Sequence, residues 1–186
     1  LKPGDAAWEL LSEGGFTAIE RDDGMHLDAT VDPKLAYNSY LSDQGYDGKN
    51  PWHGWANSAV GLEGEILSGW KMRNADLPAR ITASASEPPY MTRHAIEYIK
   101  GQDQPWCLHL SYVKPHWPYM APAPYHALYS AEDCLPPRRD EAERENAHPL
   151  HQGYMTHPES IIFSDLERRQ KILPTYTTFL SNIWHK

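Results

Sequence analysis

The most informative part of the sequence is Gln104-Pro-Trp-Cys-Leu-His-Leu-Ser-Tyr-Val-Lys-Pro-His-Trp-Pro-Tyr-Met-Ala-Pro-Ala-Pro-Tyr-His126. Its first part, residues 106–113, is a short apolar and aromatic run with a proline near each end. This pattern is typical of a strand that is buried on both faces in the middle of a parallel sheet. The second part is rich in proline, and Pro115 ends regular strand pairing because it has no N–H to donate.

Lys114 and His116 follow directly after this predicted strand. Open α/β sheets bind their ligands beyond the carboxyl ends of the strands, so both side chains are candidate site residues. A lysine ammonium beside an imidazole suits the binding of an oxyanion and the transfer of a proton to a leaving oxygen. The alternative is an inert loop in which Lys114 is solvated and His116 packs on Trp117.

A helix is predicted immediately before the strand, over residues 88–100. Two prolines open it, Gly101 ends it, and its apolar side chains recur at helical spacing on one face: Met91, Ala95, Ile96 and Ile99. The order helix, short turn, buried strand is half of a βαβ unit. The sequence therefore predicts an α/β fold, part of a largely parallel mixed sheet sandwiched by helices, within one partial domain over residues 1–186.

The remaining elements are predicted less sharply. Asp5 caps a helix over residues 6–13, a strand follows at 16–20, and one or two helical turns lie at 34–41. Residues 138–145 mix charges of both signs and indicate a solvated face. Helical spacing over residues 164–186 predicts a last helix, with Pro174 in its first turn or at a kink. This pattern is still running where the sequence stops, which we interpret as truncation.

Residues 25–87 are irregular and rich in turn signals. A loop region of this length in a compact domain indicates an insertion that covers or shapes a site. The alternative is a surface excursion that is pinned by its tryptophans. If Trp52 and Trp55 are exposed, they are candidates for contacts in a homo-oligomer.

Composition limits the possible partners. The 186 residues suffice for one domain or for a piece of a larger one, and 17 Lys plus Arg against 25 Asp plus Glu give a net charge of -8. This balance argues against nucleic acid and against an anionic membrane surface, and no apolar run approaches the about 20 residues that span a bilayer. The two cysteines indicate no disulfide framework, which favours a cytoplasmic location, and the ten histidines show no closed zinc spacing.

Two segments carry a resemblance to a known family. They are Leu-His-Leu-Ser-Tyr-Val-Lys-Pro-His-Trp-Pro at residues 108–118 and Ala-Pro-Ala-Pro-Tyr-His-Ala-Leu-Tyr at residues 121–129. Together they resemble the sulfatase family of the alkaline phosphatase superfamily, and most closely its arylsulfatase and phosphonate monoester hydrolase branch. The similarity is strongest over residues 88–150.

The resemblance implies an alkaline-phosphatase-like fold and the hydrolysis of a small anionic sulfate, phosphonate or phosphate ester. It implies a formylglycine, Ser or Cys nucleophile beside a divalent metal, Mn, Ca or Mg, and often a homo-oligomer. His116 matches the family histidine that contacts the substrate oxyanion and assists the leaving group. Lys114 occupies the place of a family basic residue and is assigned to substrate binding.

The chain also departs from the family pattern. We interpret the family's nucleophile motif, Cys/Ser-x-Pro-x-Arg, as absent, since Cys107 is followed by Leu-His-Leu and Cys134 by Leu and two prolines. The family's paired metal ligands are not found either. We therefore expect a central fragment of such an enzyme that binds no catalytic metal and has negligible activity by itself. The alternative is a non-catalytic α/β binding or assembly module. The choice between sulfate and phosphonate or phosphate esters stays open.

Overall fold

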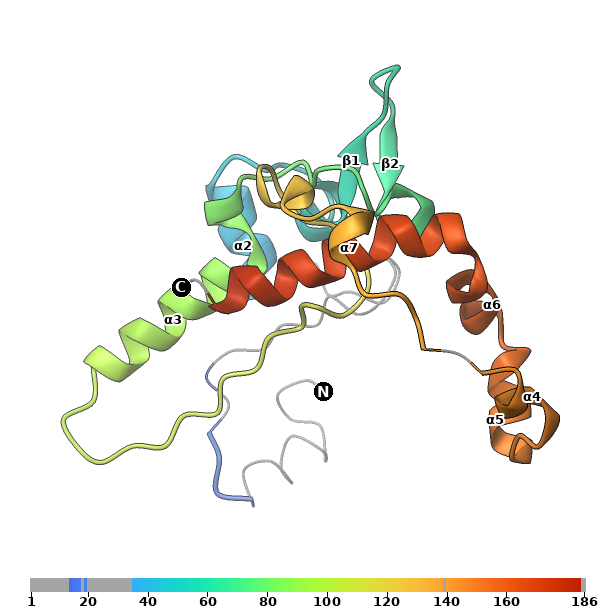
Figure 1. The fold of residues 1–186 in the computed structure, drawn as a ribbon. Helices are drawn as coiled ribbons and strands as arrows, with labels where there is room; N and C mark the ends of the chain where they lie inside the picture. The colour runs from blue at the N-terminus through green and yellow to red at the C-terminus, as the bar shows by residue number, and fades with distance from the viewer. Residues whose placement is uncertain (1–13, 18, 20–34, 139, 185–186) are drawn as a thin grey trace.

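The computed structural model describes residues 14–17, 19, 35–138 and 140–184. Its α-helices are α2 (Ala36–Asp43), α3 (Glu87–Lys100), α4 (Ala142–Glu145), α5 (Pro149–Met155), α6 (Pro158–Ser164) and α7 (Leu166–Trp184), and its strands are β1 (Ser58–Val60) and β2 (Ile66–Ser68) (Figure 1). The predicted helix at 6–13 lies outside the described residues. The helices predicted at 34–41, 88–100 and 164–186 correspond to α2, α3 and α7. At the predicted strand 16–20, the described positions 16, 17 and 19 are exposed and not in a strand.

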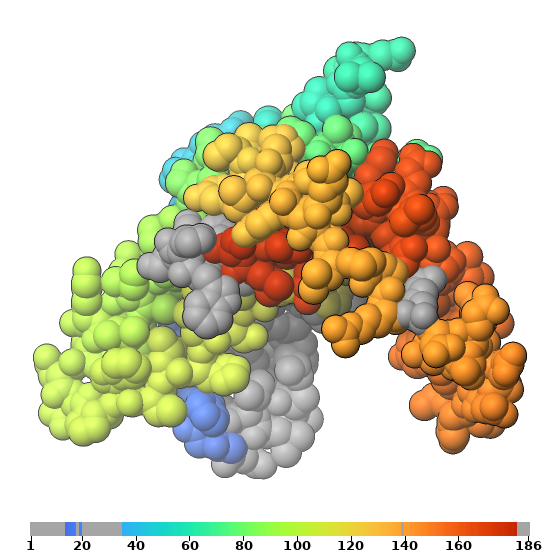
Figure 2. Space-filling view, viewed as in Figure 1, coloured from blue at the N-terminus to red at the C-terminus, as the bar shows by residue number. Residues whose placement is uncertain are grey.

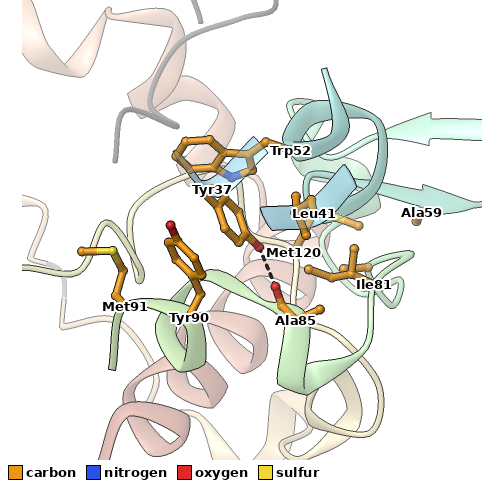
Figure 3. Close-up of a cluster of buried hydrophobic side chains, with 11 residues drawn as sticks. Tyr37, Leu41, Trp52, Ala59, Ile81, Ala85, Tyr90, Met91 and Met120 are labelled. Atoms are coloured by element: carbon orange, nitrogen blue, oxygen red, sulfur yellow. Dashed lines mark hydrogen bonds between the residues drawn. The ribbon is translucent and has the colours of Figure 1, made fainter. Parts of the chain in front are cut away.

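The main hydrophobic core lies between α2, the first turns of α3 and the loops around them (Figure 3). The Tyr37 ring is 5.2 Å from the Trp52 ring and 5.0 Å from the Tyr90 ring, and its hydroxyl donates to the Ala85 carbonyl at 2.9 Å. These contacts satisfy the polar end of a large buried ring. Residues 35–87 supply most of this core, so the interpretation of residues 25–87 as a surface excursion is wrong over that part.

The tryptophans proposed for oligomer contacts face inward. Trp52 is 3% exposed, and its backbone N–H donates to the Asn38 side chain. Trp55 is partly buried, with its indole N–H donating to the Asp47 carbonyl and the Arg80 guanidinium 4.0 Å above its ring. Aromatic rings with a polar edge are stabilised by such internal partners, which composition does not reveal.

The predicted parallel sheet is not formed within the part of the chain that the structure describes. There, β1 and β2 form a two-stranded antiparallel hairpin, paired from Ser58 with Ser68 to Val60 with Ile66. One isolated parallel bridge joins residue 79 to residue 122, where the Ala79 N–H donates to the Ala121 carbonyl. The described chain is therefore α/β, with little sheet.

Residues 106–113 are extended, but the prediction of a strand buried on both faces is wrong for this structure. Trp106 is 47% exposed, and Figure 1 shows the segment returning from α3 without a neighbouring strand. At its end, the Val113 N–H donates to the Glu87 carboxylate at 3.1 Å rather than to another strand. The physical reason is that burial of a strand requires partners for its backbone groups, and an apolar run does not contain those partners.

Helix α3 is confirmed, including its end at Gly101, whose N–H donates to the Glu97 carbonyl. Met91 and Ala95 are buried, whereas Ile96 and Ile99 are exposed, contrary to the predicted four-residue apolar face. Figure 1 shows the reason: the second half of α3 extends away from the body of the molecule, where no described segment covers it.

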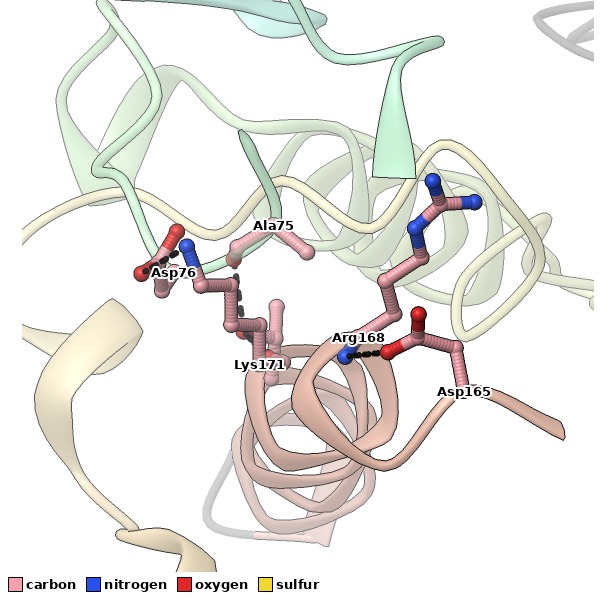
Figure 4. A network of polar contacts seen from close by, with 6 residues as sticks. Ala75, Asp76, Asp165, Arg168 and Lys171 are labelled. Carbon is pink, nitrogen blue, oxygen red and sulfur yellow. Dashed lines mark hydrogen bonds and ion pairs between the residues drawn. The ribbon is translucent and has the colours of Figure 1, made fainter. Parts of the chain in front are cut away.

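Helix α7 packs on a second, smaller core that contains Met72, Ala75 and Ile172. The Thr175 hydroxyl donates to the buried Ala75 carbonyl at 2.7 Å, and Lys171 forms a 3.6 Å ion pair with Asp76 (Figure 4). Pro174 lies inside the helix rather than in its first turn. Since proline has no N–H, the helix loses one internal hydrogen bond at this position. The contacts that Ile172 and Thr175 make with residues 72–76 stabilise the helix close to the proline.

Helices α4, α5 and α6 form a lobe at one side of the molecule (orange in Figure 2). Residues 140–145 are exposed, which confirms the predicted solvated face for the described part of that run. None of the helices within the described ranges has the length and apolar character required to cross a membrane.

The Thr175 hydrogen bond provides a test of the α7 packing. We expect Thr175→Val to lower the free energy of unfolding by about 1–3 kcal/mol, because the buried Ala75 carbonyl loses its donor while side-chain shape is kept. Urea unfolding monitored by circular dichroism measures this change. The matched control is Thr177→Val, whose hydroxyl bonds to the Leu173 carbonyl within the same helix. Equal effects of the two substitutions would contradict the role assigned to Thr175.

Candidate functional site

His116 lies at the surface, in a turn that closes where the His116 N–H donates to the Val113 carbonyl at 2.8 Å. The ring Nδ1 is 2.6 Å from the Trp117 carbonyl oxygen, and since a carbonyl only accepts, Nδ1 carries the proton of this hydrogen bond. The contact fixes the orientation of the imidazole and leaves Nε2 as the nitrogen that is available to a ligand.

A groove with a volume of about 480 Å³ opens beside His116. Its walls come from the loop at residues 113–119, the turn at Met72, helix α6 and helix α7. The lining residues are Met72, Val113, Pro115, His116, Trp117, Tyr119, Glu159, Phe163 and Tyr176. This volume lies in the range of small-molecule sites, and the groove combines an apolar wall with a few polar groups, as such sites do.

The aromatic wall of the groove is built from three segments that are distant in sequence. The Tyr119 ring centroid is 6.3 Å from that of Phe163 in α6 and 6.3 Å from that of Tyr176 in α7, with interplanar angles of 78° and 69°. Trp117 packs at 4.9 Å against Trp70 behind it. The rings therefore meet edge to face, the arrangement that aromatic quadrupoles favour.

The Tyr119 phenol has a pKa above its ordinary value. Burial is the main cause, because it disfavours the phenolate, and the nearby Tyr176 and Glu159 side chains add to the shift. Tyr119 therefore remains a neutral hydrogen-bonding group near neutral pH, and Glu159 places a carboxylate beside it.

Lys114 lies apart from this groove. It is 8% exposed, its ammonium donates to the Pro118 carbonyl, and the ammonium nitrogen is 5.1 Å from the centroid of the Phe179 ring. It lines a second cavity of about 20 Å³ together with Glu87 and Asn57. The structure thus presents His116, but not Lys114, to the larger groove, and both assigned roles stay predictions.

The metal that the family resemblance implies has no evident ligands here. Across the described ranges, no three His, Cys, Asp or Glu side chains come together in a group that could hold a metal ion. The groove offers one imidazole and one carboxylate. These residues do not fit a resident divalent metal, and we derive no catalytic step through one.

One motif requires a correction to the sequence interpretation. Residues 134–138 read Cys-Leu-Pro-Pro-Arg, which has the Cys-x-Pro-x-Arg spacing of the family nucleophile. In the structure the Cys134 thiol is 3.6 Å from the Ser130 carbonyl oxygen, and the segment is not among those that line the groove. The spacing is therefore present, but the fold does not bring it beside His116. The residues that the sequence interpretation missed are Tyr119, Glu159, Phe163 and Tyr176, for which local sequence gives no signal.

Comparisons with known proteins confirm the resemblance to the alkaline phosphatase superfamily. Over 85 residues the chain is 45% identical to the "Multifunctional alkaline phosphatase superfamily protein PehA" of Trinickia caryophylli, with 44% of this chain and 16% of that protein covered. Its fold is similar to part of the phosphonate monoester hydrolase SpPMH from Silicibacter pomeroyi, with a TM-score of 0.60 and 22% identity over 79% of this chain and 30% of that one. No protein-family model matches the chain.

The chain spans 16% of the length of the curated relative, which agrees with the prediction of a fragment-sized match. The solved structure, at 22% identity, supports the fold alone.

The shifted pKa of Tyr119 gives a pH test of the groove. Because its folded-state pKa lies above the unfolded value of about 10, the unfolded state releases the proton first, and stability is lost as pH rises through this window. Tyr119→Phe has no phenol to titrate, so we expect its free energy of unfolding to fall less than that of the unchanged chain as pH rises above 10. Urea unfolding above and below pH 10 measures this difference.

The control for this test is Tyr125→Phe, which lies outside the groove and should keep the alkaline loss. In addition, Glu159→Gln removes one of the charges that raise the pKa of Tyr119, so that phenol should titrate at lower pH by ultraviolet absorbance. An alkaline slope in Tyr119→Phe equal to that of the unchanged chain would exclude the proposed environment of this ring.

Proposed function

We propose that this chain is part of a metal-dependent hydrolase of sulfate, phosphonate or phosphate esters, with His116 on the oxyanion and leaving-group side of the site. The carrying observation is the geometry of His116, whose Nδ1–H is fixed by the Trp117 carbonyl while Nε2 is left for a ligand at the edge of a groove. The names of the two similar proteins, a superfamily hydrolase relative and a phosphonate monoester hydrolase, support the class of reaction.

In the proposed reaction, a nucleophile from the rest of the enzyme forms a bond to phosphorus or sulfur, and His116 acts as the bond between that atom and the leaving oxygen breaks. The electron pair of that bond remains on the oxygen, and the imidazolium donates its Nε2 proton to it, which leaves a neutral imidazole. Before this step, the same N–H donates a hydrogen bond to the oxyanion. General acid catalysis of this kind contributes about 10²- to 10⁴-fold in rate.

The finer features of the family remain part of this proposal. Residues 106–113 are extended and apolar, so they are suited to become a strand of a larger, largely parallel sheet once neighbouring strands from the rest of the enzyme are present. The divalent metal and its ligands would come from the same additional parts. We also propose, from the sequence features given above, that the protein is cytoplasmic and forms a homo-oligomer. On the same basis we propose that Lys114 binds substrate.

The leaving-group dependence of His116 substitutions tests the assigned role. In the complete enzyme, His116→Ala should reduce kcat/KM about 10²- to 10⁴-fold for esters with a poor, alkyl leaving group. The loss should be much smaller for a p-nitrophenyl ester, whose leaving oxygen requires no proton. A structural role would lower both rates alike, so equal losses for the two esters would overturn the assignment.

Two further variants complete this experiment. Cys134→Ala should retain the rate of the unchanged enzyme, because residues 134–138 do not line the groove, and a loss as large as that of His116→Ala would place the nucleophile at Cys134. The 186-residue chain by itself should show no turnover with Mn²⁺ or Ca²⁺. Turnover by this chain that His116→Ala abolishes would contradict the expectation that the catalytic groups are incomplete in it.

A further inference from the structure

We propose that the groove beside His116 binds a cationic alkylammonium group, so that the substrate is the ester of a cationic amino alcohol. This inference deepens the proposed function and rests on it only in treating the bound molecule as a substrate. The binding of the cation itself is argued from the groove alone. The observations that carry it are the aromatic wall and the single carboxylate that share this groove.

The aromatic wall suits a cation. Tyr119, Phe163 and Tyr176 all line the groove, and their rings meet at steep angles rather than stacking flat on one another. Several aromatic rings around one space are the arrangement that recognises quaternary ammonium groups, through the negative potential of the ring faces. Met72 adds a polarizable apolar surface at the same groove.

The groove is lined by one acidic group and one imidazole. Glu159 is the single acidic residue among those lining it, and it lies at the start of α6, close enough to Tyr119 to act on that phenol electrostatically. His116 is the single lining residue that can become a cation. An ester with an anionic centre and a cationic tail is therefore complementary to the groove, with the anion at His116 and the ammonium at Glu159.

Other occupants fit less well. A second anionic group would meet the Glu159 carboxylate, which repels it. A neutral aryl group would use the aromatic wall but would gain nothing from Glu159. The net charge of -8 attracts any cation weakly from a distance, so the test must separate this general effect from binding in the groove.

Choline and its uncharged isostere 3,3-dimethylbutan-1-ol are the probes for this test, titrated into the 186-residue chain and followed by NMR chemical shifts. We expect choline to bind at least about tenfold more tightly than the isostere, since cation–π contacts and one carboxylate favour only the charged probe. Equal affinities, or no binding of choline, would overturn the inference.

Matched variants locate the binding. Glu159→Gln should lower the affinity for choline about three- to tenfold. Glu167→Gln removes the same charge from an exposed residue outside the groove and should change this affinity less than about twofold. Tyr176→Leu should lower the affinity for choline about fivefold, whereas Tyr176→Phe should leave it unchanged because phenylalanine keeps the aromatic ring face. Equal effects within either pair would show that the cation is held elsewhere.

This result is independent of the hydrolysis test. If choline binds as expected and His116 substitutions show no dependence on leaving group, the cation site stands and the assigned chemistry is wrong. If hydrolysis depends on His116 but esters of choline and of its isostere are turned over with equal kcat/KM, the hydrolase stands and the inference on substrate class fails.

Discussion

The hydrogen bond from the Lys114 ammonium to the Pro118 carbonyl is the interaction on which the candidate site depends. A buried ammonium is costly unless its donors are satisfied, and here a carbonyl four residues onward and the face of Phe179 meet that need. The bond closes the loop between the extended segment and the buried Met120, and of the residues inside it Trp117 packs against Trp70 while His116 is exposed. The bond from His116 Nδ1 to the Trp117 carbonyl then sets the direction of the imidazole ring.

This arrangement changes the part that Lys114 plays in the chemistry of the molecule. Because Lys114 and His116 are close in sequence, the sequence predicts that both act on one oxyanion. In the structure Lys114 lines a small internal cavity, whereas His116 lines an open groove. In the described structure the Lys114 ammonium contacts the Pro118 carbonyl and the Phe179 ring and does not line the groove. The other ionisable groups that line the groove with His116 are the Tyr119 and Tyr176 phenols and the Glu159 carboxylate, so the electrostatic character of the groove is mixed rather than simply cationic.

The second core connects the fold to the site. Helix α7 is held against residues 72–76 by Ile172, the Thr175 hydroxyl and the Lys171 ion pair, and the same helix presents Tyr176 to the groove one residue further along. The packing of α7 and the shape of the groove are thus determined together. The main core around Tyr37 supports the other end of the loop through Met120, which explains why residues 35–87 matter for the site although none of them but Met72 lines it.

The sequence by itself determined the local features: the helix at 88–100 with its end at Gly101, the amphipathic pattern of the last helix, the proline-rich loop, and the family likeness that selects His116. These follow from residue spacing, from proline and glycine chemistry and from motif similarity, all of which are encoded within short windows. Only the tertiary structure decided that residues 106–113 are not a strand buried on both faces, that Trp52 is internal, that Lys114 and His116 diverge, and that α6 and α7 complete an aromatic groove. Most of these depend on contacts between segments far apart in the chain, and local periodicity carries no information about which distant surface a side chain meets.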